Sequence, residues 1–302
     1  MTLQTPDPNT VTELLPEKKQ VPLRGLYLGQ DLVKAAANLG RTLVLASFVT
    51  DRNGVIAKAD ARGHFKVPPE TRNASDWRLY QELMCQADVT ISGGDYLKSV
   101  SATGSHTQDV LYQFEQGGEF DDLGEWRLQA GYPRRSPDLA VVSHDLDFSI
   151  PERLQQSGRR IAIFTTDGAA RSERGKALAN QTTVVIGSGD EGVDGNRMVD
   201  YLSNTMGARV VMMASGPGVL ELLLKAQRLD RLYITEVQRE IPVQDPASVK
   251  TVLPDGKKPS DLEGFSLLHQ YRQDGAVAGD GSRISQFFLR FDRTSTRDSG
   301  TG

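Results

Sequence analysis

A glycine-rich junction at residues 215–218 has the composition of an anion-binding loop. The apolar run Val210–Ala214 leads directly into Ser215, Gly216, Pro217 and Gly218, and a helical pattern starts at once. Such a junction points backbone N–H groups and the positive end of a helix at one spot, which suits a phosphate or pyrophosphate. Glycine allows close approach of the backbone, and proline suits the first helical position because its missing N–H costs nothing there. An ordinary tight turn explains the same residues equally well.

Two further predicted strands end in residues that suit a phosphate-bearing ligand. The strand Val89–Ser92 runs into Gly93 and Gly94, and the strand Ile161–Thr166 ends in two threonines. Arg171 and Arg174 follow the second strand. Hydroxyl and guanidinium groups at a strand's carboxyl end can hold the 2′-phosphate that distinguishes NADP from NAD. A solvated helix face accounts for the arginines as well.

Asp51 and Asp76 are the candidate proton donors. Asp51 opens the sequence Asp-Arg-Asn-Gly after a buried strand, a signature that also fits a plain hairpin turn through Asn53 and Gly54. Asp76 lies at the start of a helical pattern over 76–87, for which Ser75 is the predicted N-cap. A carboxylate is favourable at a helix N-terminus for structural reasons alone. Either group could relay a proton through water.

Other chemistries find little support in the residues. Cys85 is the only cysteine, which excludes an internal disulfide and a cysteine-rich zinc site. The four histidines have no metal-ligand spacing, so no metal site is expected; they are His64, His106, His144 and His269. The sequence has no Gly-x-Ser-x-Gly nucleophile elbow and no zinc-deaminase signature.

Composition and charge favour a cytoplasmic protein that acts on a small molecule. The net charge of −4 argues against a nucleic-acid partner, which usually requires a basic stripe. No run of eighteen apolar residues and no basic, apolar leader occur in the sequence, so neither a membrane span nor a secretory signal is expected.

Apolar strands alternate with helical patterns along most of the chain. The pattern predicts a mostly parallel sheet covered by helices on both faces, a three-layer α/β/α arrangement. Two late runs, 231–237 and 285–291, lack an intervening helix and are expected to pair antiparallel, whereas 242–282 is predicted to form loops. The expected organisation is a flexible arm over 1–20, a single domain over 21–293 and a disordered tail over 294–302. The predicted strands are 43–49, 89–92, 139–143, 161–166, 183–187, 210–214, 231–237 and 285–291, and the predicted helices are 76–87, 169–179, 198–206 and 219–228.

Read in order, these motifs resemble those of the dihydrofolate reductase superfamily. The stretches DRNGVIA, GGDYLKSV, FTT and GPGVLELLLKAQRLDRLYIT follow one another as they do in that superfamily, over residues 41–241. The last stretch is most similar to its riboflavin-biosynthesis branch, the pyrimidine reductases that are often fused to a deaminase. The resemblance implies a dihydrofolate-reductase-like mixed sheet, NADPH as cofactor and a homodimer.

The resemblance also implies roles for individual residues. Asn53, Gly54 and Asp76 would face the substrate. The implied cofactor-binding residues are Gly93, Gly94, Thr165, Thr166, Arg171, Ser215, Gly216, Pro217, Gly218 and Val219. The expected function is reduction of 5-amino-6-(5-phosphoribosylamino)uracil or a similar heterocycle by hydride from nicotinamide C4.

The sequence departs from this branch at positions that matter for substrate. Ala214-Ser215-Gly216 stands where the reductases usually carry Glu-Gly-Gly, and their Asp-Pro pair after the first glycine motif is absent near Val100. Two alternatives therefore stay open. One is a member of the fold that binds NADPH or another ligand without turnover, and the other is a reductase of a pterin-like substrate.

Overall fold

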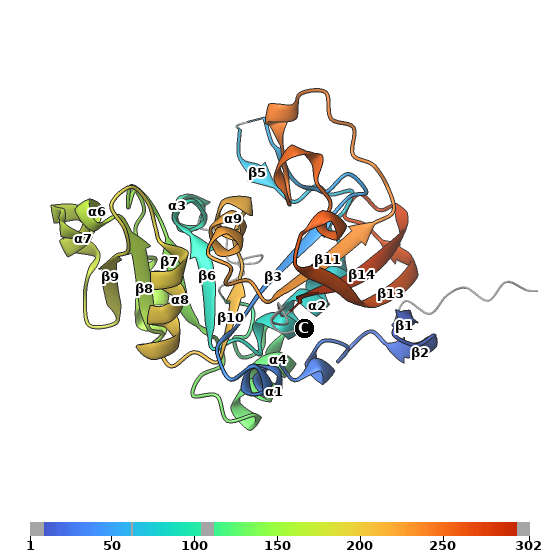
Figure 1. Cartoon of the computed structure of the whole chain (residues 1–302), viewed down its shortest axis with the longest axis horizontal. Helices are drawn as coiled ribbons and strands as arrows, with labels where there is room; N and C mark the ends of the chain where they lie inside the picture. Colours follow the sequence, from blue (N-terminus) through green and yellow to red (C-terminus); the bar gives the residue numbers. More distant parts are fainter. Residues whose placement is uncertain (1–8, 62, 104–111, 295–302) are drawn as a thin grey trace, which may run out of the picture. The chain divides into compact units, whose positions relative to one another are not determined.

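The computed structural model describes residues 9–61, 63–103 and 112–294, which divide into two compact units (Figure 1). Unit 1 comprises Met1–Gly29, Leu45–Tyr80 and Asp230–Gly302, and unit 2 comprises Gln30–Val44 and Gln81–Leu229. The single domain over 21–293 stays a prediction.

Unit 2 is built on five parallel strands. Their order across the sheet is β10, β6, β7, β8, β9, and every neighbouring pair is parallel. The strands are almost continuously buried and apolar, as expected when both faces of a parallel sheet are covered. Their bounds, β10 (Val210–Met213), β6 (Val89–Gly93), β7 (Asp138–Val142), β8 (Ile161–Thr165) and β9 (Thr183–Gly187), match the predicted strands within one residue.

Helices pack on both faces of this sheet. On one face, side chains from β7 and β8 form a buried cluster with Leu97 of α3 (Gly94–Thr103), Leu154 of α5 (Glu152–Gln156) and Leu178 of α7 (Glu173–Leu178). Successive strand residues point to opposite faces. Phe164 accordingly leaves this cluster and meets Tyr201 of α8 (Gly195–Asn204) edge-on, with the ring centroids 5.7 Å apart. Unit 2 is therefore the predicted three-layer sandwich, which also holds α1 (Leu32–Leu39), α4 (Asp121–Gln129), α6 (Asp167–Arg171) and α9 (Pro217–Lys225).

Unit 1 is mainly antiparallel. Its large sheet has the order β2, β1, β13, β14, β11, β3, in which only β11 and β3 are parallel. The predicted antiparallel pairing of the two late strands is confirmed, because β11 pairs with β14. A second sheet contains three short strands, and α2 (Ala74–Met84) begins in unit 1. The strands are β1 (Thr10–Leu15), β2 (Lys19–Pro22), β3 (Leu43–Thr50), β11 (Arg231–Val237), β13 (Phe265–Val277) and β14 (Arg283–Arg293), with β12 (Val249–Thr251), β4 (Val55–Ala59) and β5 (Phe65–Lys66) in the small sheet.

Two segments predicted to lack structure are strands. Residues 10–22, most of them assigned to an arm, form the hairpin of β1 and β2, in which buried Glu13 lies 3.2 Å from Lys19 Nζ. Residues 265–277 form the thirteen-residue β13 rather than a loop. Both segments are rich in polar residues, and β1 pairs with β13 more than 250 residues away, so composition gave the wrong expectation. The rest of the predicted arm, 1–8, and the tail beyond Thr294 lie outside the described residues.

Two helix boundaries also differ from prediction. The N-cap of α2 is Asn73 rather than Ser75, because the Asn73 side chain accepts the Asp76 N–H at 2.9 Å. The single helix predicted over 169–179 is two short helices, which break at Ser172, whose hydroxyl accepts the Gly175 N–H. At both places, a side-chain oxygen that accepts a backbone N–H sets the residue at which a helix begins.

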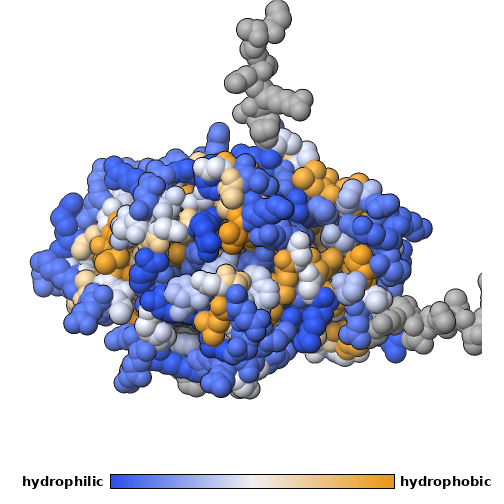
Figure 2. Space-filling view, turned by 90° about the horizontal axis from the view of Figure 1, so that it is seen from below, coloured by the Kyte–Doolittle hydropathy of each residue, from blue (hydrophilic) through white to orange (hydrophobic). Residues whose placement is uncertain are grey.

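The surface carries scattered apolar residues. The exposed large apolar side chains come from both units and are Leu39, Phe65, Val67, Leu128, Val184, Val243, Leu268 and Val277. On the face drawn in Figure 2, apolar residues form small separate patches among hydrophilic ones. In the described part of the chain, no helix combines the length and apolar character needed to cross a membrane. The predicted homodimer remains a prediction.

A buried arginine ties α4 to the segment that leads from α2 into β6. Arg127 is 2% exposed, and its guanidinium donates to the carbonyl oxygens of Cys85 at 2.5 Å and Ala87 at 2.7 Å. It also lies over the ring of Tyr132, 4.2 Å from the centroid. Burial lowers the pKa of this guanidinium, and its hydrogen bonds offset the cost of desolvation.

We expect Arg127→Met to destabilise the protein by about 3 kcal/mol, since the two carbonyls lose charge-assisted hydrogen bonds. Urea unfolding measures the loss. Arg197→Met, on an exposed position of α8, is the matched control and should stay within about 0.5 kcal/mol of the wild type. Equal effects of the two substitutions would contradict the assigned role of Arg127.

Candidate functional site

All the predicted cofactor residues belong to unit 2 and lie where its parallel strands end. We call this edge the rim and define it as residues 93–94, 143–144, 165–166, 188–189 and 214–219. Its segments contact one another in strand order. A Cβ on Gly93 would lie 3.2 Å from Ser215 Oγ, and one on Gly94 would lie 2.7 Å from Ser143 Oγ. The rim is thus one continuous feature of the molecule, as the strand-end argument predicted.

Hydrogen bonds connect the remaining rim segments. The Thr165 hydroxyl donates to the carbonyl of His144 at 3.2 Å, and the Ser188 N–H donates to the carbonyl of Thr165 at 2.9 Å. The Ala214 N–H donates to the carbonyl of Ile91 at 2.8 Å. The start of each loop is therefore fixed to the neighbouring strand.

The junction after β10 forms an open cradle. Gly216 has an extended backbone with φ −77° and ψ −178°, and α9 begins at Pro217, two residues before the predicted helix over 219–228 and with proline at the first position as expected. A Cβ built on Gly216 or Gly218 meets nothing within 4 Å. The N–H groups of Ser215, Gly216 and Gly218 donate to no acceptor among residues 9–61, 63–103 and 112–294. Free donors, the positive end of a nine-residue helix and open space together fit a pyrophosphate.

The neighbouring rim residues have internal roles. Gly94 is required by packing, because a side chain there would collide with Ser143 and with Phe148, 3.1 Å away. Val219 is buried and its N–H donates to the carbonyl of Gly216 at 3.2 Å. Both residues thus have packing or helix-forming roles, and their predicted contact with a cofactor stays a prediction.

Most of the threonines and arginines after β8 also have internal roles. Thr165 is fully buried, and Thr166 is the N-cap of α6, with its hydroxyl accepting the Ala169 N–H at 3.1 Å. Arg174 donates to the carbonyls of Leu146 and Phe148 and so fixes the loop after β7. Arg171 is exposed and has no partner in the described part of the chain. Of the basic and hydroxyl groups predicted at this strand end, Arg171 is the one available to a ligand.

The predicted substrate residues belong to unit 1. Asp51 is 1% exposed, and its carboxylate accepts three backbone N–H groups, from Asn53 at 2.9 Å, Val55 at 2.8 Å and Ile241 at 2.8 Å. Gly54 has φ +80°, which the tight turn requires and which favours glycine. Asp51 therefore fixes the turn. Asn53, at the tip, is exposed.

Asp76 has the character of a proton donor. It occupies the first turn of α2, partly buried, and the hydroxyl of Thr235 on β11 bonds to its carboxyl group. Burial raises the pKa of Asp76 to about 6, and the Thr235 bond offsets part of that rise. A carboxyl group with a pKa near neutrality can both hold and release a proton under physiological conditions.

Aromatic residues on the same helix surround Asp76. Tyr80 lies one turn further along α2, and burial together with the negative charge of Asp76 raises the pKa of Tyr80 above its usual range. Trp77 stacks on Tyr80 with 5.4 Å between the ring centroids and 12° between the planes. The sequence analysis missed Thr235 and Tyr80. The four-residue spacing of Asp76 and Tyr80 could have revealed the tyrosine, but no local signal identifies Thr235.

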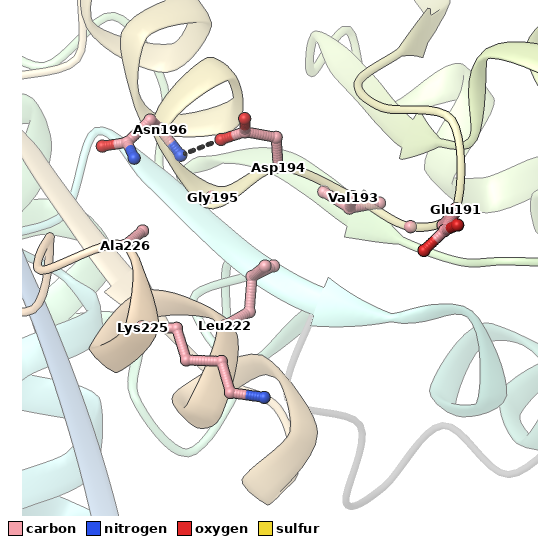
Figure 3. A pocket seen from close by; sticks show the side chains of 9 residues that line it. Glu191, Val193, Asp194, Gly195, Asn196, Leu222, Lys225 and Ala226 are labelled. Atoms are coloured by element: carbon pink, nitrogen blue, oxygen red, sulfur yellow. Dashed lines mark hydrogen bonds between the residues drawn. The ribbon is translucent and has the colours of Figure 1, made fainter.

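A surface hollow lies elsewhere on unit 2 (Figure 3). It has a volume of about 440 Å³ and is lined by the loop before α8 and the end of α9. Asp194 caps α8 by accepting the N–H groups of Asn196 and Arg197, and Lys225 pairs with Glu221 at 2.6 Å. These polar groups of the hollow are thus used internally, and it contains none of the predicted site residues.

Metal-binding groups do not cluster in the described residues. No three His, Cys, Asp or Glu side chains come together there in a way that could hold an ion. His106 lies outside those residues.

Comparison with known proteins rests on structure alone. No protein-family model matches the sequence, and no curated protein matches it. A pyrimidine reductase-like protein from Corynebacterium diphtheriae superposes with a TM-score of 0.58 and 17% identity, over 90% of this chain and 99% of that one. The riboflavin biosynthesis reductase Rib7 of Saccharomyces cerevisiae superposes with a TM-score of 0.53 and 14% identity, over 88% of this chain and 99% of that one.

A bifunctional protein is similar in structure to this chain over part of its own length. The Thermotoga maritima diaminohydroxyphosphoribosylaminopyrimidine deaminase/5-amino-6-(5-phosphoribosylamino)uracil reductase matches 87% of this chain but 60% of its own, with a TM-score of 0.53 and 13% identity. At these identities the likeness concerns the fold. The chain has the fold of these pyrimidine reductases, and the predicted α/β class with a mixed, mostly parallel sheet is confirmed.

Proposed function

We propose that this protein is an NADPH-dependent reductase of a small nitrogen heterocycle, in the simplest case a 5-amino-6-(5-phosphoribosylamino)uracil reductase-like enzyme of riboflavin biosynthesis. The observation that carries the proposal is the open cradle at Ser215–Gly218, in a chain with the fold of reductases. Its free N–H groups match the charge and shape of a dinucleotide's pyrophosphate.

Backbone N–H groups and one guanidinium of unit 2 would bind the cofactor. Ser215, Gly216 and Gly218 would donate backbone hydrogen bonds to the pyrophosphate, and Gly93 would leave room beside Ser215. Arg171 would pair with a 2′-phosphate, since its guanidinium is exposed. When bound, NADPH supplies the hydride from nicotinamide C4.

Asp76 is the proposed proton donor. Asp76 is preferred to Asp51 because the Asp51 carboxylate accepts three backbone N–H groups that fix its turn, whereas burial raises the pKa of Asp76 to about 6. The hydroxyl of Thr235 would keep the carboxyl group oriented, and Asn53 would contact substrate from the exposed tip of its turn.

A second candidate is a protein that binds NADPH without turnover. Ala214 leaves the end of β10 without the acidic group that the resembling reductases carry. Nicotinamide fluorescence would report binding, and nicotinamide absorbance would report turnover over a panel of pyrimidine and pterin substrates. Binding with no turnover on either class favours this candidate, and turnover of a pterin alone favours a pterin-like substrate. The homodimer and the cytoplasm remain proposals, and sedimentation equilibrium tests the first.

Gly216→Val should weaken NADPH binding by at least tenfold, about 1.4 kcal/mol, because the new side chain occupies the cradle. The fold should tolerate it, since the backbone there is extended and a Cβ meets nothing within 4 Å. Fluorescence titration gives the Kd and a melting curve checks the fold. Gly29→Val, also free of contacts within 4 Å, is the control. Unchanged affinity in a folded Gly216→Val variant would show that the loop is only a turn.

Asp76→Asn should change both activity and the pH dependence of stability. A folded pKa of about 6, above the ordinary 3.8, means that the carboxyl group contributes stability below pH 3.8 that is lost as the pH rises through 6. The wild type should therefore lose stability over this window, and Asp76→Asn should lose less. Turnover should rise in the wild type as the pH falls through 6, and this rise should vanish in the variant. Parallel stability curves for the two proteins would refute the raised pKa.

Arg171→Ala should weaken NADPH binding more than NADH binding, because only NADPH carries the 2′-phosphate. The ratio of the two dissociation constants is the measurement. Arg197→Ala, another exposed arginine of unit 2, should leave that ratio unchanged. Equal losses for both nucleotides would remove Arg171 from the site.

A further inference from the structure

A buried network of three side-chain amides lies beneath the start of α2 in unit 1. Asn73 is 5% exposed, Gln273 1% and Gln286 0%. Gln273 and Gln286 face each other across the pairing of β13 and β14, and Asn73 lies immediately before α2. Buried amides cost free energy unless their hydrogen bonds are made, so their partners show what the network holds in place.

Gln286 is the centre of the network. Its Nε2 donates to Asn73 Oδ1 at 3.1 Å and to Gln273 Oε1 at 2.8 Å, and its Oε1 accepts from Asn73 Nδ2 at 2.8 Å. Asn73 Nδ2 also donates to the carbonyl of Thr71 at 3.0 Å. Both polar atoms of the Gln286 amide are therefore engaged, and two of its bonds fix the orientation of Asn73.

Asn73 transmits this orientation to Asp76. Its Oδ1 accepts the backbone N–H of Asp76 at 2.9 Å, so the first turn of α2 is anchored to β14. The backbone before the helix is held by the same hairpin, since Asn73 bridges to Ala278 and the Gly279 N–H donates to the carbonyl of Arg72 at 2.8 Å.

The side chain of Asp76 is held from the same sheet. Thr235, which bonds to it, lies opposite Phe288, two residues from Gln286 on β14. The carboxyl group of Asp76 is thus bonded to β11, and its backbone N–H is anchored to β14 through Asn73. An N-cap alone would not need this arrangement, because a serine can cap a helix without a second partner.

We propose that Gln286 is a positioning residue, which holds Asp76 against Thr235 in its partly buried site through the side chain of Asn73. The role in proton delivery rests on the proposed function, whereas the placement of the carboxyl group does not. If the anchor is lost, the first turn of α2 loosens and water reaches the carboxyl group, so the desolvation that raises the pKa of Asp76 diminishes.

Gln286→Met, which keeps the length of the side chain and removes its hydrogen bonds, tests the proposal in the full chain. Carbon-detected NMR of the Asp76 carboxyl group, assigned with Asp76→Asn, should show a titration midpoint at least one pH unit lower, a tenfold change in proton affinity. The pH profile of turnover should move by the same amount, with NADPH affinity unchanged. Gln270→Met, on β13, is the matched control because no hydrogen bond of its side chain occurs among the described residues, and its midpoint should stay in place.

Asn73→Ser provides a second variant if Gln286→Met does not fold. Serine retains a cap for the helix but cannot reach Gln286, so the same fall in the midpoint is expected. An unchanged midpoint in a folded Gln286→Met or Asn73→Ser variant would overturn the positioning role. A shifted midpoint in a protein that turns over no substrate would support the positioning role and contradict only the proposed function.

Discussion

Parallel pairing of five strands is the constraint on which the candidate site depends. Since neighbouring strands in unit 2 run in one direction, their carboxyl ends meet at one edge, and segments more than a hundred residues apart contact each other there. Hydrogen bonds between the Thr165 and His144 segments, and the close approach of Gly93 to Ser215, fix that edge. The N–H groups of Ser215, Gly216 and Gly218 can serve a ligand because they donate to no acceptor among the described residues.

In unit 1, the surroundings of the Asp76 carboxyl group allow it to take up a proton near neutral pH. Burial of Asp76 disfavours its charge, and the Thr235 hydroxyl keeps that penalty moderate. Asp51 shows the opposite arrangement, in which three backbone N–H groups surround a buried carboxylate. The two aspartates have the same chemistry, and their surroundings separate a structural role from a candidate catalytic one.

The sequence predicted the elements of unit 2 well because their signals are local. Continuous apolar runs such as 161–165, and the proline at the first position of α9, need no distant partner to be recognised. Unit 1 was harder, because β1 pairs with β13 across more than 250 residues, and Asn73 is buried against Gln286, 213 residues away. The same limit applies to the site. Gly216 could be identified from its neighbours in sequence, whereas the Thr235 partner of Asp76 is 159 residues away and no local pattern indicates it.

The central claim is that the cradle at Ser215–Gly218 holds the pyrophosphate of NADPH. Amide NMR of the isotopically labelled chain during NADPH titration tests it most directly, because it reports the N–H groups themselves. We predict saturable shifts of the Ser215, Gly216 and Gly218 amides, larger than those of the Asn196 and Lys225 amides at the surface hollow. Saturation of the protein with NADPH while the three cradle amides stay unshifted, or failure of NADPH to bind, would contradict the account.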